Sequence, residues 1–184
     1  MAPLWPKRRL VDALQGGAQR KLTHYALLRF PQEAFLMQTL NVIDTAIKSG
    51  IFQTFTRLLE GSPLEARLRS QELFTLFAPV DISFAYLPPE TLDHLLRAEN
   101  QGILSEVLGY HVVLGKIMSC ELTGLCKRPT VYGVELTIDN SNEVRVDGAK
   151  LLHVDIRACN GVIHGIDRLL MPEQVCCRSV ALIR

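Results

Sequence analysis

The stretch FTLFAPVDISFAYLP, residues 74–88, joins a strand pattern to a helix start. Apolar residues occupy both alternating sets of positions in its first half, which predicts a strand buried on both faces. Pro79 is expected to end this strand. Asp81 is expected to cap a short helix over ISFAYL, because an aspartate side chain accepts hydrogen bonds from the free N–H groups of a first helical turn.

A second stretch, NGVIHGIDRLLMP at residues 160–172, has the features of a final strand. Asn160-Gly161 predicts a tight turn before it. His164 lies between aliphatic residues within the strand, where it is a candidate for catalysis, for metal binding or for a buried structural role. We favour an interior residue with both ring nitrogens hydrogen-bonded, because buried polar groups normally have partners.

The pattern changes from helical to extended along the chain. Ser62, Pro63 and Glu65 form a helix-start signature in which serine caps, proline takes the first helical position and glutamate follows three residues later. Helical spacing of apolar residues is found over 40–50, 51–61, 88–100 and 102–111, and strand-like runs follow over 110–117, 130–139 and 143–156. Helices, one strand and then a run of antiparallel strands predict an α+β fold.

The two stretches resemble the two conserved boxes of the fasciclin domain family. YHVV (110–113), VDGA (146–149) and DIRACNG (155–161) resemble further elements of that family, in the family's order. The resemblance covers about residues 40–172. It implies a fasciclin-like β-wedge or sandwich of mainly antiparallel strands, with N-terminal helices packed against it.

The resemblance also sets the expected domain limits. We expect a basic N-terminal arm over 1–38, a fasciclin-like domain over 39–172 and a C-terminal tail over 173–184. Box residues expected to hold the fold together are Phe77, Ala78, Pro79, Asp81, Phe84, Asn160, Gly161, His164 and Asp167.

Several positions depart from the family pattern. Val80 replaces a threonine that often caps the next helix, so Asp81 is expected to take over that cap. Cys159 replaces a common threonine, Gly165 a bulky residue, and Asp147 the usual asparagine. These changes weaken the transfer of any fine binding specificity from the family, and none of them threatens the fold.

Charge and composition exclude some functions. The net charge of +1 over 184 residues argues against bulk nucleic-acid binding. Residues 1–29 carry a net charge of +5, which leaves the remainder mildly acidic. This basic start gives at most a weak contact with an anionic membrane. Neither a clear signal peptide nor an apolar run of about 20 residues is found.

Catalytic and metal sites find little support in the sequence. The five cysteines are a poor disulfide framework, although Cys120 and Cys126 are spaced to bridge a loop in an oxidising compartment. A pair of Cys159 with His164 lacks any visible activating group. His111, His153 and His164 have no spacing that indicates a metal site. We therefore expect no enzyme activity, no cofactor and no metal.

Four residues are candidates for partner binding. In matrix members of the family, the regions matching Tyr110 and His111, and Asp155 and Ile156, are implicated in integrin-dependent adhesion. A contact role requires Tyr110 and His111 to be partly exposed; the alternative is that both hold the helix against the sheet. Asp155 and Asp167 are expected at strand ends, and Lys127 and Arg128 in a loop too weakly charged for a polyanion site.

The family resemblance implies a non-catalytic adhesion or surface-interaction module. Its expected partner is a cell-surface or matrix protein, integrin-like, or a polysaccharide, with no nucleic acid involved. The expected location is extracellular or at the cell surface. The alternative is an intracellular regulatory or small-ligand-binding domain in the cytoplasm or an organelle, which the absence of a clear signal peptide favours.

Overall fold

The computed structural model describes residues 39–87, 89–172 and 175. The expected arm over 1–38 and, apart from Val175, the expected tail over 173–184 lie outside the described residues. The described α-helices are α3 (Val42–Ser49), α4 (Gln53–Leu59), α5 (Pro63–Leu68), α6 (Asp81–Phe84), α7 (Pro89–Leu96) and α8 (Gln101–Tyr110), with short 3-10 turns η2 (Ala98–Asn100) and η3 (Ser119–Glu121).

The strands form one seven-stranded sheet in the order β2-β1-β7-β6-β5-β4-β3. Strands β1 and β7 pair in parallel and the other neighbouring strands pair antiparallel, which confirms the predicted α+β fold. The strands are β1 (Phe74–Pro79), β2 (Val112–Leu114), β3 (Gly124–Pro129), β4 (Glu135–Asn140), β5 (Arg145–Val146), β6 (Ala149–Ala158) and β7 (Gly161–Ile166).

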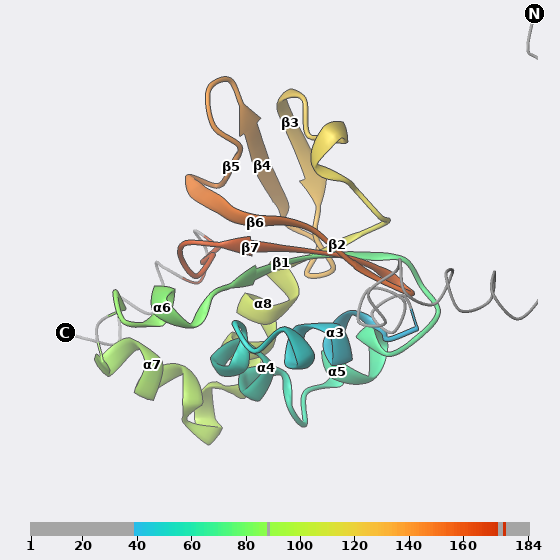
Figure 1. Cartoon of the computed structure of the whole chain (residues 1–184). Helices are drawn as coiled ribbons and strands as arrows, with labels where there is room; N and C mark the ends of the chain where they lie inside the picture. Colours follow the sequence, from blue (N-terminus) through green and yellow to red (C-terminus); the bar gives the residue numbers. More distant parts are fainter. Residues whose placement is uncertain (1–38, 88, 173–174, 176–184) are drawn as a thin grey trace, which may run out of the picture. The chain divides into compact units, whose positions relative to one another are not determined.

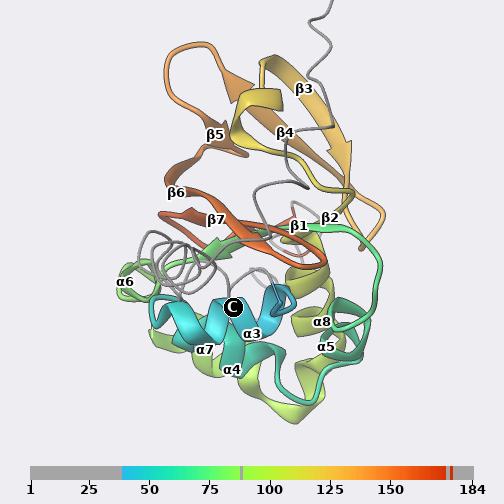
Figure 2. The ribbon, with the colours of Figure 1, turned by 45° about the vertical axis from the view of Figure 1, so that its right-hand side comes forward.

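Strands β1 and β7, which come from the two stretches 74–88 and 160–172, lie side by side at the centre of the sheet. In the parallel pair, Phe74 is opposite Gly161 and Phe77 is opposite His164. Helices α3, α4, α5, α7 and α8 lie on one side of β1 and β7, and β3, β4 and β5 project from the other side as a wing (Figures 1 and 2). Every residue of β1 and β7 is buried, as expected for strands covered on both faces.

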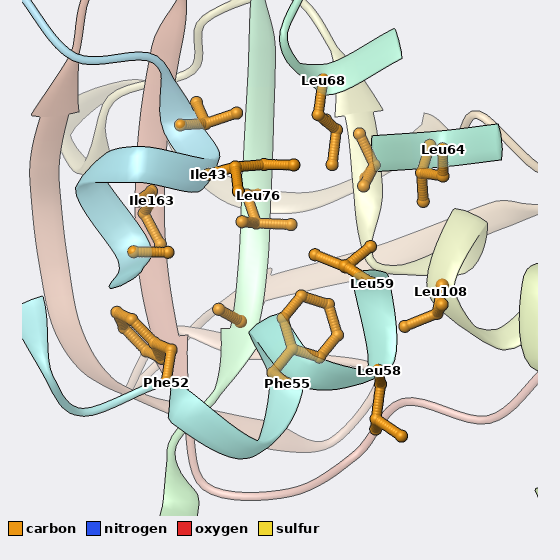
Figure 3. Packing of buried hydrophobic residues seen from close by; sticks show 14 of the residues in the cluster. Ile43, Phe52, Phe55, Leu58, Leu59, Leu64, Leu68, Leu76, Leu108 and Ile163 are labelled. Carbon is orange, nitrogen blue, oxygen red and sulfur yellow. The ribbon is translucent and has the colours of Figure 1, made fainter. Parts of the chain in front are cut away.

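Apolar side chains fill both sides of the central strands. The larger cluster joins the helices to β1 and β7, and Figure 3 shows Phe52 and Phe55 from the start of α4 beside Leu76 and Ile163 from the strands. A second cluster lies between the wing and the other face of the central strands; it contains Phe77, Tyr110, Val113, Leu122, Leu136, Ile138, Val146, Ala149, Ile166 and Leu170.

Local signals set the helix ends as the sequence predicts. Gly50 ends α3 in the left-handed conformation, with φ of 73°, where a side chain would be strained. The Ser62 hydroxyl accepts the Glu65 N–H at 3.3 Å at the start of α5. The Glu65 carboxylate accepts the N–H of Gly61, so the return bond falls one residue earlier than the usual capping pattern.

The expected role of Asp81 as the cap of its own helix is wrong. Val80 is the capping residue of α6, and no side chain caps that helix. The Asp81 carboxylate instead accepts the N–H groups of Gln53 at 3.1 Å and Thr54 at 2.7 Å, at the start of α4. Because Phe52 offers α4 no side-chain acceptor, a residue 28 positions away satisfies its first turn.

Two further boundaries differ from the sequence expectation. Lys127 and Arg128 lie in strand β3 rather than in a loop, and residues 130–134 form the turn that leads into β4. Thr130 donates its N–H to the Val134 carbonyl at 3.1 Å and accepts the Gly133 N–H at 2.9 Å across this turn. Charged side chains and a proline hide the strand pattern of β3 in the sequence.

Asn160 and Gly161 connect the β6–β7 turn to the helices. The Asn160 side chain accepts the Val42 N–H at 2.8 Å and donates to the carbonyls of Leu68 at 2.7 Å and Ser70 at 2.8 Å. Gly161 lies so close to β1 that an added Cβ would be 2.0 Å from the Phe74 carbonyl oxygen. A side chain at position 161 would therefore push β1 and β7 apart.

Candidate functional site

His164 is fully buried in β7, and both of its ring nitrogens have backbone partners. Nδ1 accepts the Asp155 N–H at 3.3 Å, and Nε2 lies 2.9 Å from the Ile117 carbonyl oxygen. A carbonyl only accepts, so Nε2 carries the proton and the ring is neutral. Burial lowers the pKa of His164, against the opposing effects of the Ile117 bond and the Asp155 charge.

Asp155 lies inside β6 rather than at a strand end, which corrects the sequence expectation. Its φ of 58° marks the irregularity where the β6–β7 register shifts. The carboxylate accepts the Ser119 N–H at 2.8 Å and hydroxyl at 2.5 Å. Thr75 on β1 accepts the Ile117 N–H at 2.9 Å and donates to the Gly115 carbonyl at 2.7 Å. Side chains from β1, β6 and β7 thus hold segment 115–119 on the sheet.

The charge on Asp155 is stabilised by the same contacts. Burial alone would raise the pKa of Asp155, but the two bonds from Ser119 and the positive charge of Arg157 lower it below its usual value. The carboxylate is therefore ionised at neutral pH and already engaged. Ile156 is half-buried and packs against the helix-side core, so its side chain contributes to the scaffold.

His111 has the complementary arrangement at the end of α8. It is fully buried, with Nδ1 2.7 Å from the Val107 carbonyl oxygen and Nε2 accepting the Leu170 N–H at 3.0 Å. Its ring lies 5.3 Å from that of Phe55 between centroids. Burial lowers the pKa of His111 to about 4, against the bond to Val107, which raises it.

The expected contact role of Tyr110 and His111 requires exposed side chains, and the structure places both in the interior. Tyr110 is 6% exposed and His111 is 0% exposed. The Tyr110 hydroxyl donates to the Asp147 carboxylate, whose other oxygen accepts the Thr137 N–H at 2.8 Å. Neither side chain has the exposure that the contact role requires, and both connect α8 to the rest of the domain.

Among the described residues, neither a metal-binding cluster nor a pair of Cys159 with His164 is formed. In the part of the chain that the structure describes, no group of three or more histidine, cysteine, aspartate or glutamate side chains is placed to hold a metal ion. Cys159 is a free, exposed thiol. Both nitrogens of His164 are bonded to backbone groups, so His164 has no nitrogen available to activate that thiol. Cys120 and Cys126 are also free thiols in the structure.

Asp167 follows the last strand and extends its pairing. Its Oδ1 accepts the Lys150 N–H at 2.9 Å, and its own N–H donates to the Lys150 carbonyl at 3.0 Å. Arg168, the next residue, donates to the same Asp167 oxygen at 3.3 Å, with 59% of its side chain exposed. Asp167 and Arg168 lie on the rim of a surface groove, which is described next.

An apolar surface groove lies between α6, β6 and the residues after β7. It encloses about 670 Å³. Ile82 is 64% exposed, Tyr86 79% and Leu152 45%, and all three line this one groove. The residues that line the groove are Ile82, Ser83, Tyr86, Leu87, Leu152, Asp167, Arg168 and Leu169.

The sequence interpretation missed this groove. Ile82 and Tyr86 are four residues apart, a spacing that places two side chains on one face of a helical turn. That signal is inside the first box, where it suggests a core-facing stripe. Leu152 gives no separate signal, because its exposure depends on the irregular course of β6. Only the fold brings the three side chains to one surface.

In residues 39–87, 89–172 and 175, none of the helices is long and apolar enough to cross a membrane.

The protein is an α+β domain. Its buried polar residues stabilise the fold, and exposed apolar side chains line a surface groove. A family model for the Fasciclin domain matches residues 50–172, and the chain belongs to this family. The family match confirms the resemblance expected from the two boxes.

Similar proteins range from single-domain length to much longer chains. An uncharacterized protein of Synechocystis sp. is 35% identical over 131 residues, which cover 71% of this chain and 97% of that protein. Human periostin is 32% identical over 126 residues, which cover 66% of this chain and 15% of periostin. This chain therefore corresponds to nearly the whole of the first protein and to a small part of the second.

A solved structure shows the same fold. A pair of FAS1 domains from the insect cell adhesion molecule fasciclin I has a TM-score of 0.65 with 19% sequence identity. The match covers 74% of this chain and 52% of that one. At this identity the likeness establishes the fold alone.

Proposed function

We propose that the chain is a non-catalytic adhesion or surface-interaction module that binds a protein partner through the apolar groove. The observation that carries the proposal is the exposure of Ile82, Tyr86 and Leu152 around one hollow. Burying these side chains against a partner removes apolar surface from water, which favours association. Asp167 and Arg168 form an exposed ion pair on the rim, which gives the apolar contact a polar border.

The groove suits a protein better than a polysaccharide. Two of its exposed residues are aliphatic, and aliphatic side chains pack against apolar protein side chains more readily than against hydroxyl-covered sugars. Tyr86 is the natural anchor, because tyrosines at interfaces combine a large rigid ring with a polar end. An integrin-like surface protein or a matrix protein falls within this class of partner.

Binding, rather than chemistry, agrees with how the polar residues are used. His111, His164 and Asp155 are each engaged with backbone or hydroxyl groups of the scaffold. Family membership supports an extracellular or cell-surface location. Sequencing the N-terminus of the native protein and locating it with an antibody test that location.

The alternative is an intracellular small-ligand domain. A volume of about 670 Å³ is within the range of ligand pockets, which favours this alternative. Such pockets, however, bury most of the ligand's surface. The groove walls here are themselves about half or more exposed at Ile82, Tyr86 and Leu152, and this favours a broad protein contact.

Attachment of cells that make the protein, measured on plates coated with it, tests the proposal. The double variant Ile82→Ser/Tyr86→Ser removes two exposed apolar side chains, and loss of an interface tyrosine costs about 2 kcal/mol or about 30-fold in affinity. Leu73→Ser is the matched control, because Leu73 is 51% exposed and does not line the groove. Equal attachment to wild type and to the double variant would refute the groove as the contact.

A further inference from the structure

Strand β3 is the last strand of the sheet, and all six of its residues pair with β4. Its six residues pair with β4 from Gly124 opposite Asn140 to Pro129 opposite Glu135. Figure 2 shows β3 as the outermost strand of the wing. Among the described residues its other edge is open along Leu125 and Lys127, whereas just beyond its end Thr130 forms an antiparallel bridge with Val113 of β2. An open strand edge carries unpaired N–H and C=O groups that can template another strand.

The hydrogen-bond pattern identifies the outward-pointing groups. Antiparallel pairs alternate between residues bonded to each other and residues whose backbone groups point away. Thr137 on β4 uses its carbonyl and its N–H for the backbone and side chain of Asp147, on the side away from β3. Thr137 is opposite Lys127, so the N–H and C=O of Lys127 point to the open edge.

The same alternation applies to Leu125, two residues earlier. Its N–H and C=O also point outward, so the edge offers two evenly spaced pairs of backbone groups. Among the described residues, the backbone hydrogen bonds outside regular pairing involve neither Leu125 nor Lys127. The Leu125 side chain is 73% exposed and lies on the same face of β3 as Lys127.

Positive charge flanks both faces of this edge. Side chains alternate along a strand, so Lys127 and Arg128 lie on opposite faces. Lys127 reaches Glu135 only at 4.0 Å, with both side chains more than half exposed, which makes a weak pair. Within residues 39–87, 89–172 and 175, Arg128 makes no ion pair.

We propose that the free edge of β3 binds an extended acidic segment of a partner protein by strand addition. The backbone groups of Leu125 and Lys127 supply the pairing, and Lys127 and Arg128 select carboxylates on the two faces of the incoming strand. Pairing with a second copy is disfavoured, because it would bring two lysines and two arginines together across the new ladder. This edge site is independent of the groove of the proposed function.

The test uses an acetylated and amidated peptide in which pairs of adjacent glutamates alternate with valines, so that carboxylates lie on both faces of the extended peptide; it is added to isotope-labelled protein and followed by NMR. We expect the amide signals of Leu125 and Lys127 to shift and their hydrogen exchange to slow. Two control peptides carry lysine in place of glutamate, or N-methyl groups on the amides that face β3. We expect both to bind at least tenfold more weakly. The lysine peptide carries positive charges that Lys127 and Arg128 repel, and the N-methylated peptide lacks the N–H donors that pair with β3.

The double variant Lys127→Glu/Arg128→Glu should weaken binding of the acidic peptide about tenfold or more and leave the melting temperature unchanged, because both side chains are exposed. It should also leave attachment through the groove unchanged, which separates the two sites. The proposal is overturned if the N-methylated peptide binds as well as its parent, or if the shifts map away from β3. It is likewise overturned if the acidic peptide does not bind, or if sedimentation shows a dimer that this variant disrupts.

Discussion

Two substitutions of His164 separate the contribution of its ring hydrogen bonds from that of its packing against Phe77. His164→Phe keeps a ring of similar size beside Phe77, whose ring lies 5.5 Å away at an interplanar angle of 24°. It removes both hydrogen bonds of the imidazole. His164→Ala removes the bonds and the ring together, so the difference between the two variants reports the packing contribution.

The expected losses in the free energy of unfolding follow from the backbone groups that each variant leaves without a hydrogen bond. The Asp155 N–H and the Ile117 carbonyl both lose their partner. An unsatisfied buried polar group costs about 1–3 kcal/mol. We therefore expect His164→Phe to lower the free energy of unfolding by about 3 kcal/mol. His164→Ala adds a cavity beneath Phe77, and the total loss should reach about 6 kcal/mol.

Urea unfolding followed by circular dichroism at pH 7.5 measures these losses. His153→Ala is the matched control, because His153 lies on the neighbouring strand with its side chain exposed. We expect it to change the free energy of unfolding by less than about 1 kcal/mol. Amide hydrogen exchange of Ile117 and Ser119 gives a second readout, since the segment 115–119 loses one of its attachments in both variants.

Two outcomes would contradict this reasoning. If His164→Phe unfolds at the wild-type urea concentration, the two backbone bonds contribute nothing net to stability. If His164→Ala and His164→Phe lose the same stability, the packing against Phe77 carries no weight. A variant with wild-type stability that fails to bind its partner would instead assign His164 a direct functional role.

Two more predictions concern other polar residues that support the fold. The pKa of His111 is about 4 in the fold and about 6.5 unfolded. Neutral His111 therefore contributes its full share of the free energy of unfolding above pH 6.5, and about 3 kcal/mol of that contribution is lost as the pH falls to 4. Urea unfolding at pH 7.5 and at pH 4.5 measures the loss. Equal free energies of unfolding at the two pH values would contradict the prediction. Asp81→Ala should cost about 1–2 kcal/mol by uncapping α4, whereas Glu60→Ala, an exposed residue at the other end of α4, should cost nothing measurable.

Sequence reasoning predicted the elements whose signals are local. The α3 stop at Gly50, the Ser62 cap and the fully buried β1 each depend on neighbouring residues, and all three are found in the structure. Strand β3 was missed because Lys127, Arg128 and Pro129 break the apolar alternation that marks a half-buried strand. An edge strand needs one partner only, so its sequence is under weaker constraint than that of a central strand.

Long-range partners could not be predicted from spacing. Asp81 looked like the cap of α6 because it begins that helix, yet its carboxylate caps α4, a neighbouring helix that is distant in sequence. Asp155 looked like a strand end because no periodic pattern announces an irregularity within β6. In both cases the local rule was sound, and a residue distant in sequence was the better hydrogen-bond partner.

The location of the polar box residues separates fold from function in this domain. His111, His164 and Asn160 attract attention as functional candidates because buried polar side chains are costly. Here each of them satisfies backbone groups of a distant element, so substitutions there act on stability first. Ile82 and Tyr86 make no comparable contribution to the core and expose most of their surface. A change of binding partner is therefore expected to arise at the groove and the β3 edge, where substitutions leave the scaffold intact.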